Sequence, residues 1–243
     1  MSSDKIIFHE KQQGELCAQH CLNALLQEDF FNAVDLANLG EQLDREERAR
    51  LAEGGTDSED YLRFCSSRSQ NMDDSGFFSV QVIAKALQVA NLELISFDNP
   101  HMTQYQNDPT TAQAFICNFN QHWFTIRKFA NQWMNLDSVK SKPEPLSDNY
   151  LRLYLAQLKN DGYSIYVIKG TLPGCLADEY LSKNPLPEFY RVQQSLKHSN
   201  KTYKVDNFDD DNDDPTYQEA IENSLRDTED YDLELALRMS LEQ

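Results

Sequence analysis

The sequence predicts an α+β fold, in which a block of helices is followed by a mostly antiparallel β-sheet. Apolar residues recur at helical spacing through most of the first ninety residues. After residue 90 the apolar segments become short, aromatic and β-branched, and turn residues bound them. Helices and strands segregated along the chain in this way are typical of α+β proteins.

Four helices are predicted in the N-terminal block, and a fifth is predicted before the last strand. Gly54 and Gly55 end the second helix, and Asp74 or Ser75 is expected to cap the fourth. The predicted helices span residues 15–27, 33–52, 57–66, 77–90 and 148–160.

Five strands are predicted in the second half of the domain. A turn around residues 129–132 joins the third strand to the fourth. The predicted strands span residues 92–97, 114–119, 122–129, 132–138 and 163–170.

The composition is that of a globular protein, since 40% of the 243 residues are hydrophobic and 26% are charged. The sequence contains neither an apolar run of 18 residues nor an N-terminal apolar segment of the secretory type. We therefore expect the protein in the cytoplasm and the nucleus. An odd number of cysteines, five, in a reducing compartment argues against a disulfide framework.

The net charge of −18 is concentrated at the C-terminal end. Residues 205–243 contain fourteen Asp or Glu and two Arg, so they carry −12 and leave −6 for the first 204 residues. Such an acidic segment repels nucleic-acid phosphates and anionic lipids. We therefore expect no nucleic-acid and no membrane partner, and instead a partner with a basic surface.

A domain boundary is predicted near residue 185, where the apolar density falls. The globular domain then spans residues 1–185, and residues 186–212 form a flexible linker. The remaining tail repeats with a period of 16 residues and divides into residues 213–228 and 229–243. Each repeat predicts a short helix with one shared face, which holds Tyr217, Ala220 and Ser224 in the first copy and Leu233, Ala236 and Ser240 in the second.

Cys17 is the candidate nucleophile, because it falls in the first turn of the first predicted helix. A free thiol has a pKa near 8.5, and a helix N-terminus or an imidazolium neighbour can lower it. His122 opens the third strand and Asp137 closes the fourth. In an antiparallel hairpin the numbers of facing residues sum to a constant, here 259 or 261 depending on the turn, and 122 and 137 sum to 259. The acid is therefore expected opposite or nearly opposite the histidine.

Two further assignments accompany this candidate site. Gln12, five residues before Cys17, is a side-chain amide that could donate to an oxyanion. The cysteines other than Cys17 are assigned to packing: Cys21, Cys65, Cys117 and Cys175.

Two alternatives remain open from the residues alone. Cys17, His20 and Cys21 share one helical face near His9, which could indicate a metal site. Structural zinc sites usually draw ligand pairs from separate loops, however, and the sequence has no second pair, so no metal is expected. The acidic tail helices could also pack on their own domain rather than bind a partner.

Five blocks of sequence resemble, in this order, the Josephin-domain cysteine deubiquitinases, and the ataxin-3 branch of that family most of all. They lie within residues 4 to about 180 and read IFHEKQQGELCAQHCLNALLQ, AEGGTDSEDY, NMDDSGFFSVQVI, FICNFNQHWFTIRK and QWMNLDS. The resemblance implies a papain-like α+β fold without a metal or organic cofactor.

The same resemblance implies a role for each candidate residue. Cys17 corresponds to the nucleophile, His122 to the general base and acid, and Gln12 to the oxyanion donor. The family's third catalytic residue, Asn in ataxin-3 and Asp in other Josephins, falls on Asp137. A carboxylate there would hold the imidazolium more strongly than an amide.

The tail resembles a pair of ubiquitin-interacting motifs, in which a large apolar residue, Ala and Ser follow an acidic run. Together the domain and the tail imply a monomeric isopeptidase that removes ubiquitin from polyubiquitin chains or ubiquitinated proteins. One alternative is an adaptor that binds ubiquitin chains through a weak or silent catalytic domain. A protease for ordinary peptides is a second alternative, which the tail disfavours.

Overall fold

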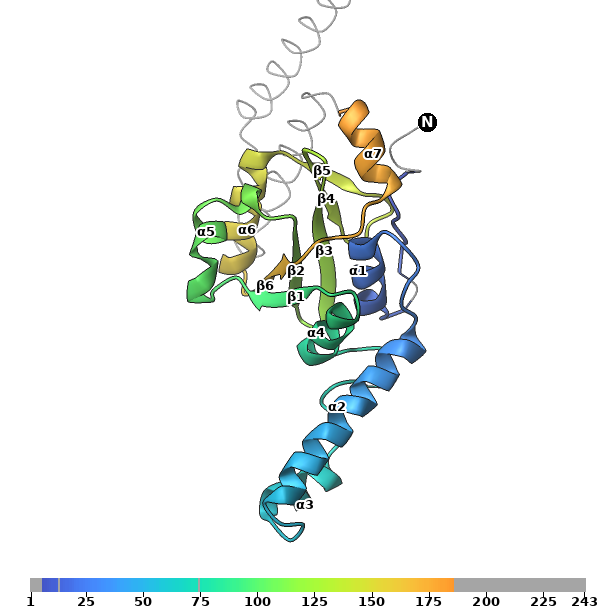
Figure 1. The fold of residues 1–243 in the computed structure, drawn as a ribbon, viewed down its shortest axis with the longest axis vertical. Helices are drawn as coiled ribbons and strands as arrows, with labels where there is room; N and C mark the ends of the chain where they lie inside the picture. The colour runs from blue at the N-terminus through green and yellow to red at the C-terminus, as the bar shows by residue number, and fades with distance from the viewer. Residues whose placement is uncertain (1–5, 13, 74, 186–243) are drawn as a thin grey trace, which may run out of the picture. The chain divides into compact units, whose positions relative to one another are not determined.

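A six-stranded antiparallel sheet lies at the centre of the fold, in the strand order β1-β6-β2-β3-β4-β5 (Figure 1). The computed structural model describes residues 6–185, apart from residues 13 and 74. The strands in these residues are β1 (Glu93–Ser96), β2 (Ala114–Phe119), β3 (His122–Phe129), β4 (Gln132–Leu136), β5 (Glu144–Leu146) and β6 (Ser164–Lys169).

The helices gather mainly before the sheet in the sequence. In the described part of the chain they are α1 (Cys17–Leu26), α2 (Ala33–Glu53), α3 (Glu59–Ser66), α4 (Val80–Val89), α5 (Thr103–Asn107), α6 (Asp148–Asn160) and α7 (Leu176–Lys183), with two short 3₁₀ helices, η2 (Pro100–Met102) and η3 (Pro109–Thr111). The predicted α+β fold, a helical block followed by a mostly antiparallel sheet, is confirmed.

Helices cover both faces of the sheet. Since neighbouring residues of a strand point to opposite faces, each strand contributes side chains to the apolar clusters on both sides. On β2, Ile116 belongs to the cluster that α1 and α4 complete, whereas Phe115 belongs to the cluster under α6. Within α1, Leu22 and Leu25 are completely buried. Each such leucine contributes about 1.5–3 kcal/mol relative to an exposed position, so α1 is held firmly against the sheet.

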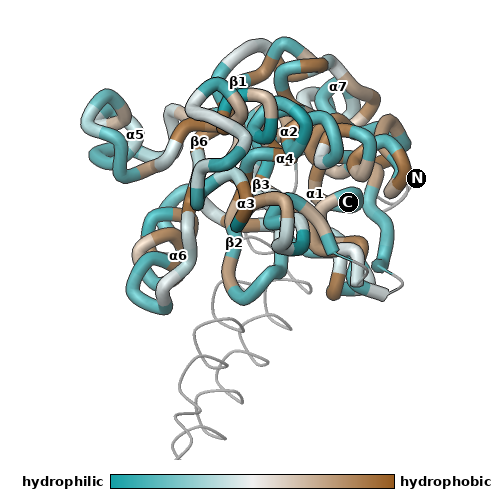
Figure 2. Tube along the Cα trace, turned by 90° about the horizontal axis from the view of Figure 1, so that it is seen from below, coloured by the Kyte–Doolittle hydropathy of each residue, from teal (hydrophilic) through white to brown (hydrophobic). Residues whose placement is uncertain are grey.

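α2 and α3 extend away from the sheet as a pair, with α3 folded back beside α2 (Figure 1). α2 begins with a capping box, in which the Asn32 side chain accepts from the Asp35 N–H and the Asp35 carboxylate accepts from the Asn32 N–H. Figure 2 shows α5 as largely hydrophilic, in keeping with its lack of buried residues. None of these helices carries a candidate catalytic residue, whereas Cys17 is the first residue of α1.

The predicted cap of the fourth helix is wrong. α4 begins at Val80, where Ser79 Oγ accepts from the Val82 N–H at 3.3 Å. Ser75 instead lies in a turn in which its N–H and hydroxyl both donate to the Asp73 carboxylate. Ser75, one of the two residues predicted to cap the helix, is therefore hydrogen-bonded to Asp73, and the other, Asp74, lies outside the described residues. The helix starts three residues later than expected.

Besides the two 3₁₀ helices, one strand and two helices of the described residues were not predicted, and each has a weak sequence signal. β5 is a three-residue edge strand that contains Pro145. α5 is only five residues long, and α7 buries only Ala177 and Leu181. Short elements with so few buried residues do not produce a recognisable periodicity.

Among the residues that the structure describes, no helix is long and apolar enough to cross a membrane. The predicted linker at residues 186–212 and both tail motifs, with their six predicted ubiquitin-binding residues, lie outside the described residues.

Candidate active site

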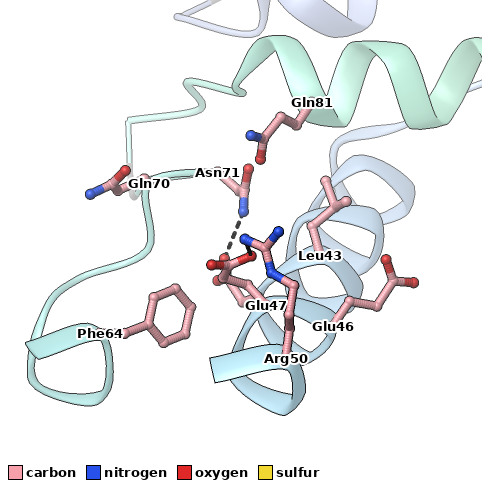
Figure 3. Close-up of a pocket in the computed structure, with 9 residues that line it drawn as sticks. Leu43, Glu46, Glu47, Arg50, Phe64, Gln70, Asn71 and Gln81 are labelled. Atoms are coloured by element: carbon pink, nitrogen blue, oxygen red, sulfur yellow. Dashed lines mark hydrogen bonds and ion pairs between the residues drawn. The ribbon is translucent and has the colours of Figure 1, made fainter. Parts of the chain in front are cut away.

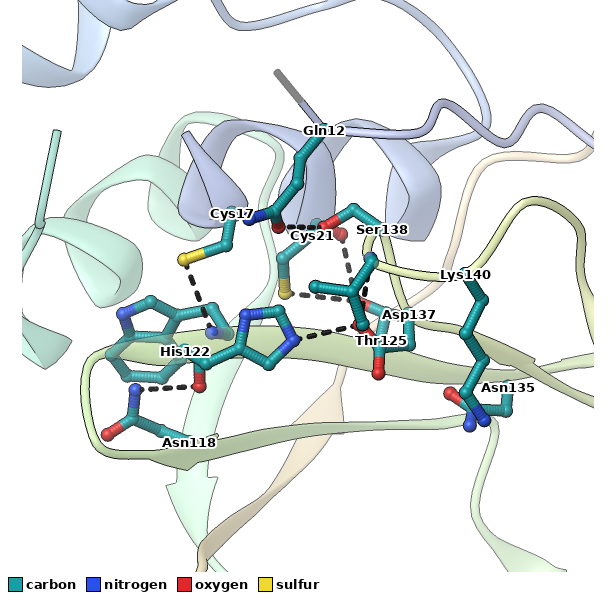
Figure 4. A network of polar contacts seen from close by, with 12 residues as sticks. Gln12, Cys17, Cys21, Asn118, His122, Thr125, Asn135, Asp137, Ser138 and Lys140 are labelled. Carbon is teal, nitrogen blue, oxygen red and sulfur yellow. Dashed lines mark hydrogen bonds and ion pairs between the residues drawn. The ribbon is translucent and has the colours of Figure 1, made fainter. Parts of the chain in front are cut away.

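Cys17 is the first residue of α1 and is buried, with 4% of its surface exposed. Its thiol donates to the Gln121 carbonyl oxygen at 3.3 Å, and its sulfur accepts from the Trp123 N–H at 3.4 Å. The helix starts two residues later than predicted, so the thiol lies even closer to the positive end of the helix dipole. The helix and the β2–β3 hairpin together fix the position of the sulfur (Figure 4).

The turn that presents this carbonyl is a two-residue hairpin turn between Phe119 and His122. Its two residues, Asn120 and Gln121, have φ angles of 46° and 67°. Positive φ at both central positions is the pattern of a type I′ turn, whose twist matches that of the flanking strands. The same turn therefore positions both the Gln121 carbonyl, which accepts from the thiol, and His122, which is the first residue of β3.

His122 joins the thiol to an acid. Its Nε2 donates to Asp137 Oδ1 at 2.8 Å, and Figure 4 shows the other ring nitrogen on the side of Cys17. The hydrogen bond to Asp137 and a weaker one with Cys17 raise the pKa of His122 to about 9, against an opposing effect of burial. The site therefore favours an imidazolium at neutral pH.

The β3–β4 register explains how Asp137 reaches the ring. Phe129 pairs with Gln132, and the ladder ends at the Thr125 and Leu136 pair. The paired numbers sum to 261, so the second of the two predicted registers is the observed one, and Asp137 lies one residue beyond the strand. Its carboxylate meets His122 diagonally, and the Val139 N–H donates to the same Oδ1 at 3.2 Å.

Gln12 is anchored to the residue after Asp137. Its N–H donates to the Ser138 carbonyl at 2.8 Å, and its Oε1 accepts from the Ser138 hydroxyl at 2.7 Å. The Gln12 Nε2 donates to the Gly14 carbonyl at 3.1 Å, which leaves the second proton of this amide for another acceptor. The nitrogen lies on the Cys17 side in Figure 4. Ser138, which links Gln12 to the segment of Asp137, was not predicted from the sequence.

The other cysteines lie in different surroundings. Burial raises the pKa of Cys21 and of Cys117 well above the usual range of a thiol, so both are packing residues as predicted. Cys175 is half-buried beside α7. Cys65 is exposed on α3, so its assignment to packing is wrong.

The histidines of the alternative metal site have other partners. His20 Nδ1 lies 3.1 Å from Glu10 Oε2, and His9 Nε2 lies 3.0 Å from the Lys140 carbonyl oxygen. Within the residues that the structure describes, no group of three or more His, Cys, Asp or Glu side chains is placed to hold a metal ion.

A cavity of about 540 Å³ lies away from these residues, between α2, α3 and the start of α4 (Figure 3). Asp44 in its wall accepts from Asn71 at 2.7 Å, and Glu47 accepts from Arg50. None of the candidate catalytic residues lines it.

In a comparison with known protein families, residues 12–169 of the chain match the Josephin family model. Ataxin-3 from Rattus norvegicus is 53% identical over 195 residues, which cover 79% of this chain and 55% of that protein. Ataxin-3 from Homo sapiens is 55% identical over 188 residues, covering 77% and 50%. The ataxin-3-like protein of Homo sapiens is 44% identical over 253 aligned positions, covering 97% and 71%.

The chain spans about half the length of the ataxin-3 proteins that it matches. The family match contains Gln12, Cys17, His122 and Asp137, whereas α7 lies beyond its end. From the extent of the match and the level of identity, the chain belongs to the Josephin family.

Proposed function

We propose that this chain is a thiol-dependent deubiquitinase, which hydrolyses the bond between the C-terminal glycine of ubiquitin and a lysine amine. The observation that carries the proposal is the arrangement of a thiol at a helix N-terminus, an imidazole and a carboxylate. Cys17 begins α1, and His122 Nε2 lies 2.8 Å from Asp137. A nucleophile, a base and a group that orients the base are the structural signature of covalent acyl transfer.

In the proposed reaction the Cys17 thiolate attacks the glycine carbonyl carbon, and the carbonyl oxygen becomes an oxyanion. The second N–H of the Gln12 side-chain amide donates a hydrogen bond to that oxyanion. His122, held as an imidazolium by Asp137, protonates the leaving lysine amine, and a thioester forms between Cys17 and ubiquitin. Water then attacks the thioester with His122 as base, which releases ubiquitin and regenerates the thiol.

The domain boundaries are part of the proposal. Residues 1–185 form the catalytic domain, and the repeats at residues 213–228 and 229–243 bind ubiquitin chains. The support for binding is the spacing of a large apolar residue, Ala and Ser after each acidic run. We place the enzyme in the cytoplasm and nucleus as a monomer.

An adaptor that binds chains without cleaving them is the second candidate, favoured by the same tail repeats. The two candidates differ in their reaction with a ubiquitin derivative that carries an electrophile at its C-terminus. A deubiquitinase forms a covalent adduct with this probe at Cys17, whereas an adaptor binds it without forming one.

The test compares three proteins by intact mass and by cleavage of diubiquitin. Wild type and Cys21→Ala should form the adduct, because Cys21 is one turn deeper and faces Thr125. Cys17→Ala should form none and should not cleave diubiquitin. An unreactive wild type would favour the adaptor, and a reactive Cys17→Ala protein would assign the nucleophile elsewhere.

A further inference from the structure

α1 is fastened to β3 by polar contacts that repeat along both elements. The Cys17 sulfur accepts from the Trp123 N–H, and the Cys21 carbonyl accepts from the Thr125 hydroxyl at 2.8 Å. One further turn along, the Leu25 carbonyl accepts from an Arg127 Nη1–H. Figure 4 shows the Cys17 and Thr125 contacts beside the His122 ring.

The repeat follows from the geometry of a helix that lies along a strand. Four residues of an α-helix advance by about 6.0 Å, and two residues of a strand advance by about 6.7 Å. Steps of four residues in α1 therefore stay in phase with steps of two in β3 over this short distance. The contacts form a ladder that fixes how far α1 can slide along β3.

Two rungs of this ladder are polar side chains in the interior of the protein. Thr125 is fully buried and Arg127 is 1% exposed. A buried hydroxyl or guanidinium is costly unless its hydrogen bonds are made, and Arg127 Nε has no hydrogen-bond partner among the described residues. An apolar residue at Thr125 would fill similar space without this cost, so packing alone does not account for a hydroxyl there.

We propose that Thr125 and Arg127 are positioning residues, which set the distance between the Cys17 thiol and the His122 ring. This inference rests on the roles proposed above for those two residues. His122 directly precedes Trp123 on β3, and Cys17 is the first residue of α1. A slide of α1 along β3 therefore changes the separation of the two reacting groups directly.

Thr125 is the better position for the test, because Arg127 also binds the Pro173 carbonyl and the Asp178 carboxylate. Thr125→Val keeps the shape and removes the hydroxyl, and Thr125→Ser keeps the hydroxyl. Cys21→Ala is the matched control, since it removes a thiol that contacts Thr125 at 3.1 Å but leaves the carbonyl acceptor of the rung in place.

The primary measurement needs no ubiquitin. The rate of alkylation of Cys17 by iodoacetamide is followed against pH, with the Cys17 peptide quantified by mass spectrometry. We expect the profile of Thr125→Val to move toward that of His122→Ala, whereas Thr125→Ser and Cys21→Ala keep the wild-type profile. If wild type and His122→Ala have the same profile, the proposed catalytic pair is wrong and the positioning role falls with it.

The second measurement is the turnover of a ubiquitin substrate. A misplacement of about 1 Å can cost about a hundredfold in rate, so we expect kcat of Thr125→Val to fall about tenfold with KM nearly unchanged. Thr125→Ser should stay within about twofold of wild type. A wild type that alkylates as expected but does not cleave ubiquitin would refute the proposed function and leave the positioning role standing.

A Thr125→Val protein that loses thermal stability but keeps the wild-type pH profile and kcat would overturn the inference, because Thr125 would then be merely structural. Should that variant not fold, Arg127→Lys supplies the decisive profile. It keeps the charge that faces Asp178 but loses the forked geometry of the guanidinium. A wild-type profile in Arg127→Lys would likewise overturn the inference.

Discussion

Asp137 is the residue that most changes the chemistry of His122. The carboxylate accepts from the ring, and this hydrogen bond is the largest cause of the raised pKa, about 9. A raised pKa in the folded protein means that the protonated ring stabilises the fold. This stabilisation is complete below the unfolded pKa of about 6.5 and is lost as the pH rises through about 9.

We therefore predict that Asp137→Asn removes a pH-dependent part of the stability. The comparison is made in a Cys17→Ala background, which removes the thiol beside the His122 ring. Between about pH 6 and about pH 9.5, the protein with Asp137 should lose about 1–2 kcal/mol more stability than the protein with Asp137→Asn. The partial exposure of the ring keeps the figure below the full linkage value. Urea unfolding at the two pH values measures it, and parallel pH dependence of the two proteins would contradict the assigned cause.

Measurements of activity should distinguish two roles of Asp137, namely orientation of the His122 ring and stabilisation of the ring's positive charge. Asp137→Asn keeps an acceptor for the ring, so we predict activity within about tenfold of wild type over a narrower pH range. Asp137→Ala leaves the ring without a fixed partner and should lose about a hundredfold. The pH profile of diubiquitin cleavage measures both, and equal activity in all three proteins would mean that Asp137 is not a catalytic partner.

Residues whose geometry is set locally could be predicted, and residues set by distant contacts could not. Helical spacing placed Cys17, and the arithmetic of one hairpin placed Asp137 near His122. Ser138 and Thr125 were missed because their partners, Gln12 and Cys21, lie 126 and 104 residues away. No local pattern encodes a pairing over such a distance.

At the scale of elements, α7 makes more contacts with the rest of the domain than its weak sequence pattern indicates. Asp178 on α7 accepts from Arg127 Nη2 at 3.2 Å and from the Ala130 N–H at 3.0 Å, so the helix holds both a buried cation and the β3–β4 turn. Leu181 adds an apolar contact to the cluster of Ile7 and Phe129. The Josephin match ends at residue 169, before this helix.

We predict that α7 belongs to the stable domain. Ending the chain at residue 185 should leave the free energy of unfolding of the domain unchanged. Ending it at residue 170 should lower that free energy by about 3 kcal/mol or more, because Arg127 loses its carboxylate partner Asp178 and the apolar contacts of Ala177 and Leu181 are removed. Asp178→Ala should cost about 2 kcal/mol, and Glu179→Ala, an exposed neighbour, should stay within about 0.5 kcal/mol. Urea unfolding compares these four variants with the unaltered chain, and equal stability would assign α7 to the linker.

At the scale of the whole molecule, the sequence predicts that the domain cleaves ubiquitin chains and that the tail binds them. Two weak binding segments joined by a few residues can raise avidity by about 10² to 10⁴, because the second contact becomes intramolecular. A coil of the length predicted for the linker, residues 186–212, spans about 30 Å, which is comparable with a small domain. A held chain could thus reach Cys17.

We predict that Ser224→Asp combined with Ser240→Asp makes the enzyme insensitive to chain length. The added charges fall on the predicted binding face of each repeat, so long chains should be bound and processed poorly while diubiquitin is cleaved nearly normally. Cleavage of chains of defined length measures the effect, with Asn223→Asp as a charge control off that face. An unchanged dependence on chain length would refute the proposed role of the tail.

The ladder between α1 and β3 also bears on how the protein is made. Its rungs join residues that are 102 to 106 positions apart, so the thiol emerges from the ribosome long before the strand that carries the histidine. At about 5–20 residues per second, this interval lasts about 5–20 seconds. During that time Cys17 lacks the His122 imidazole, so the nascent chain lacks the proposed catalytic pair. If the proposed mechanism holds, synthesis itself delays activity until β3 has been made.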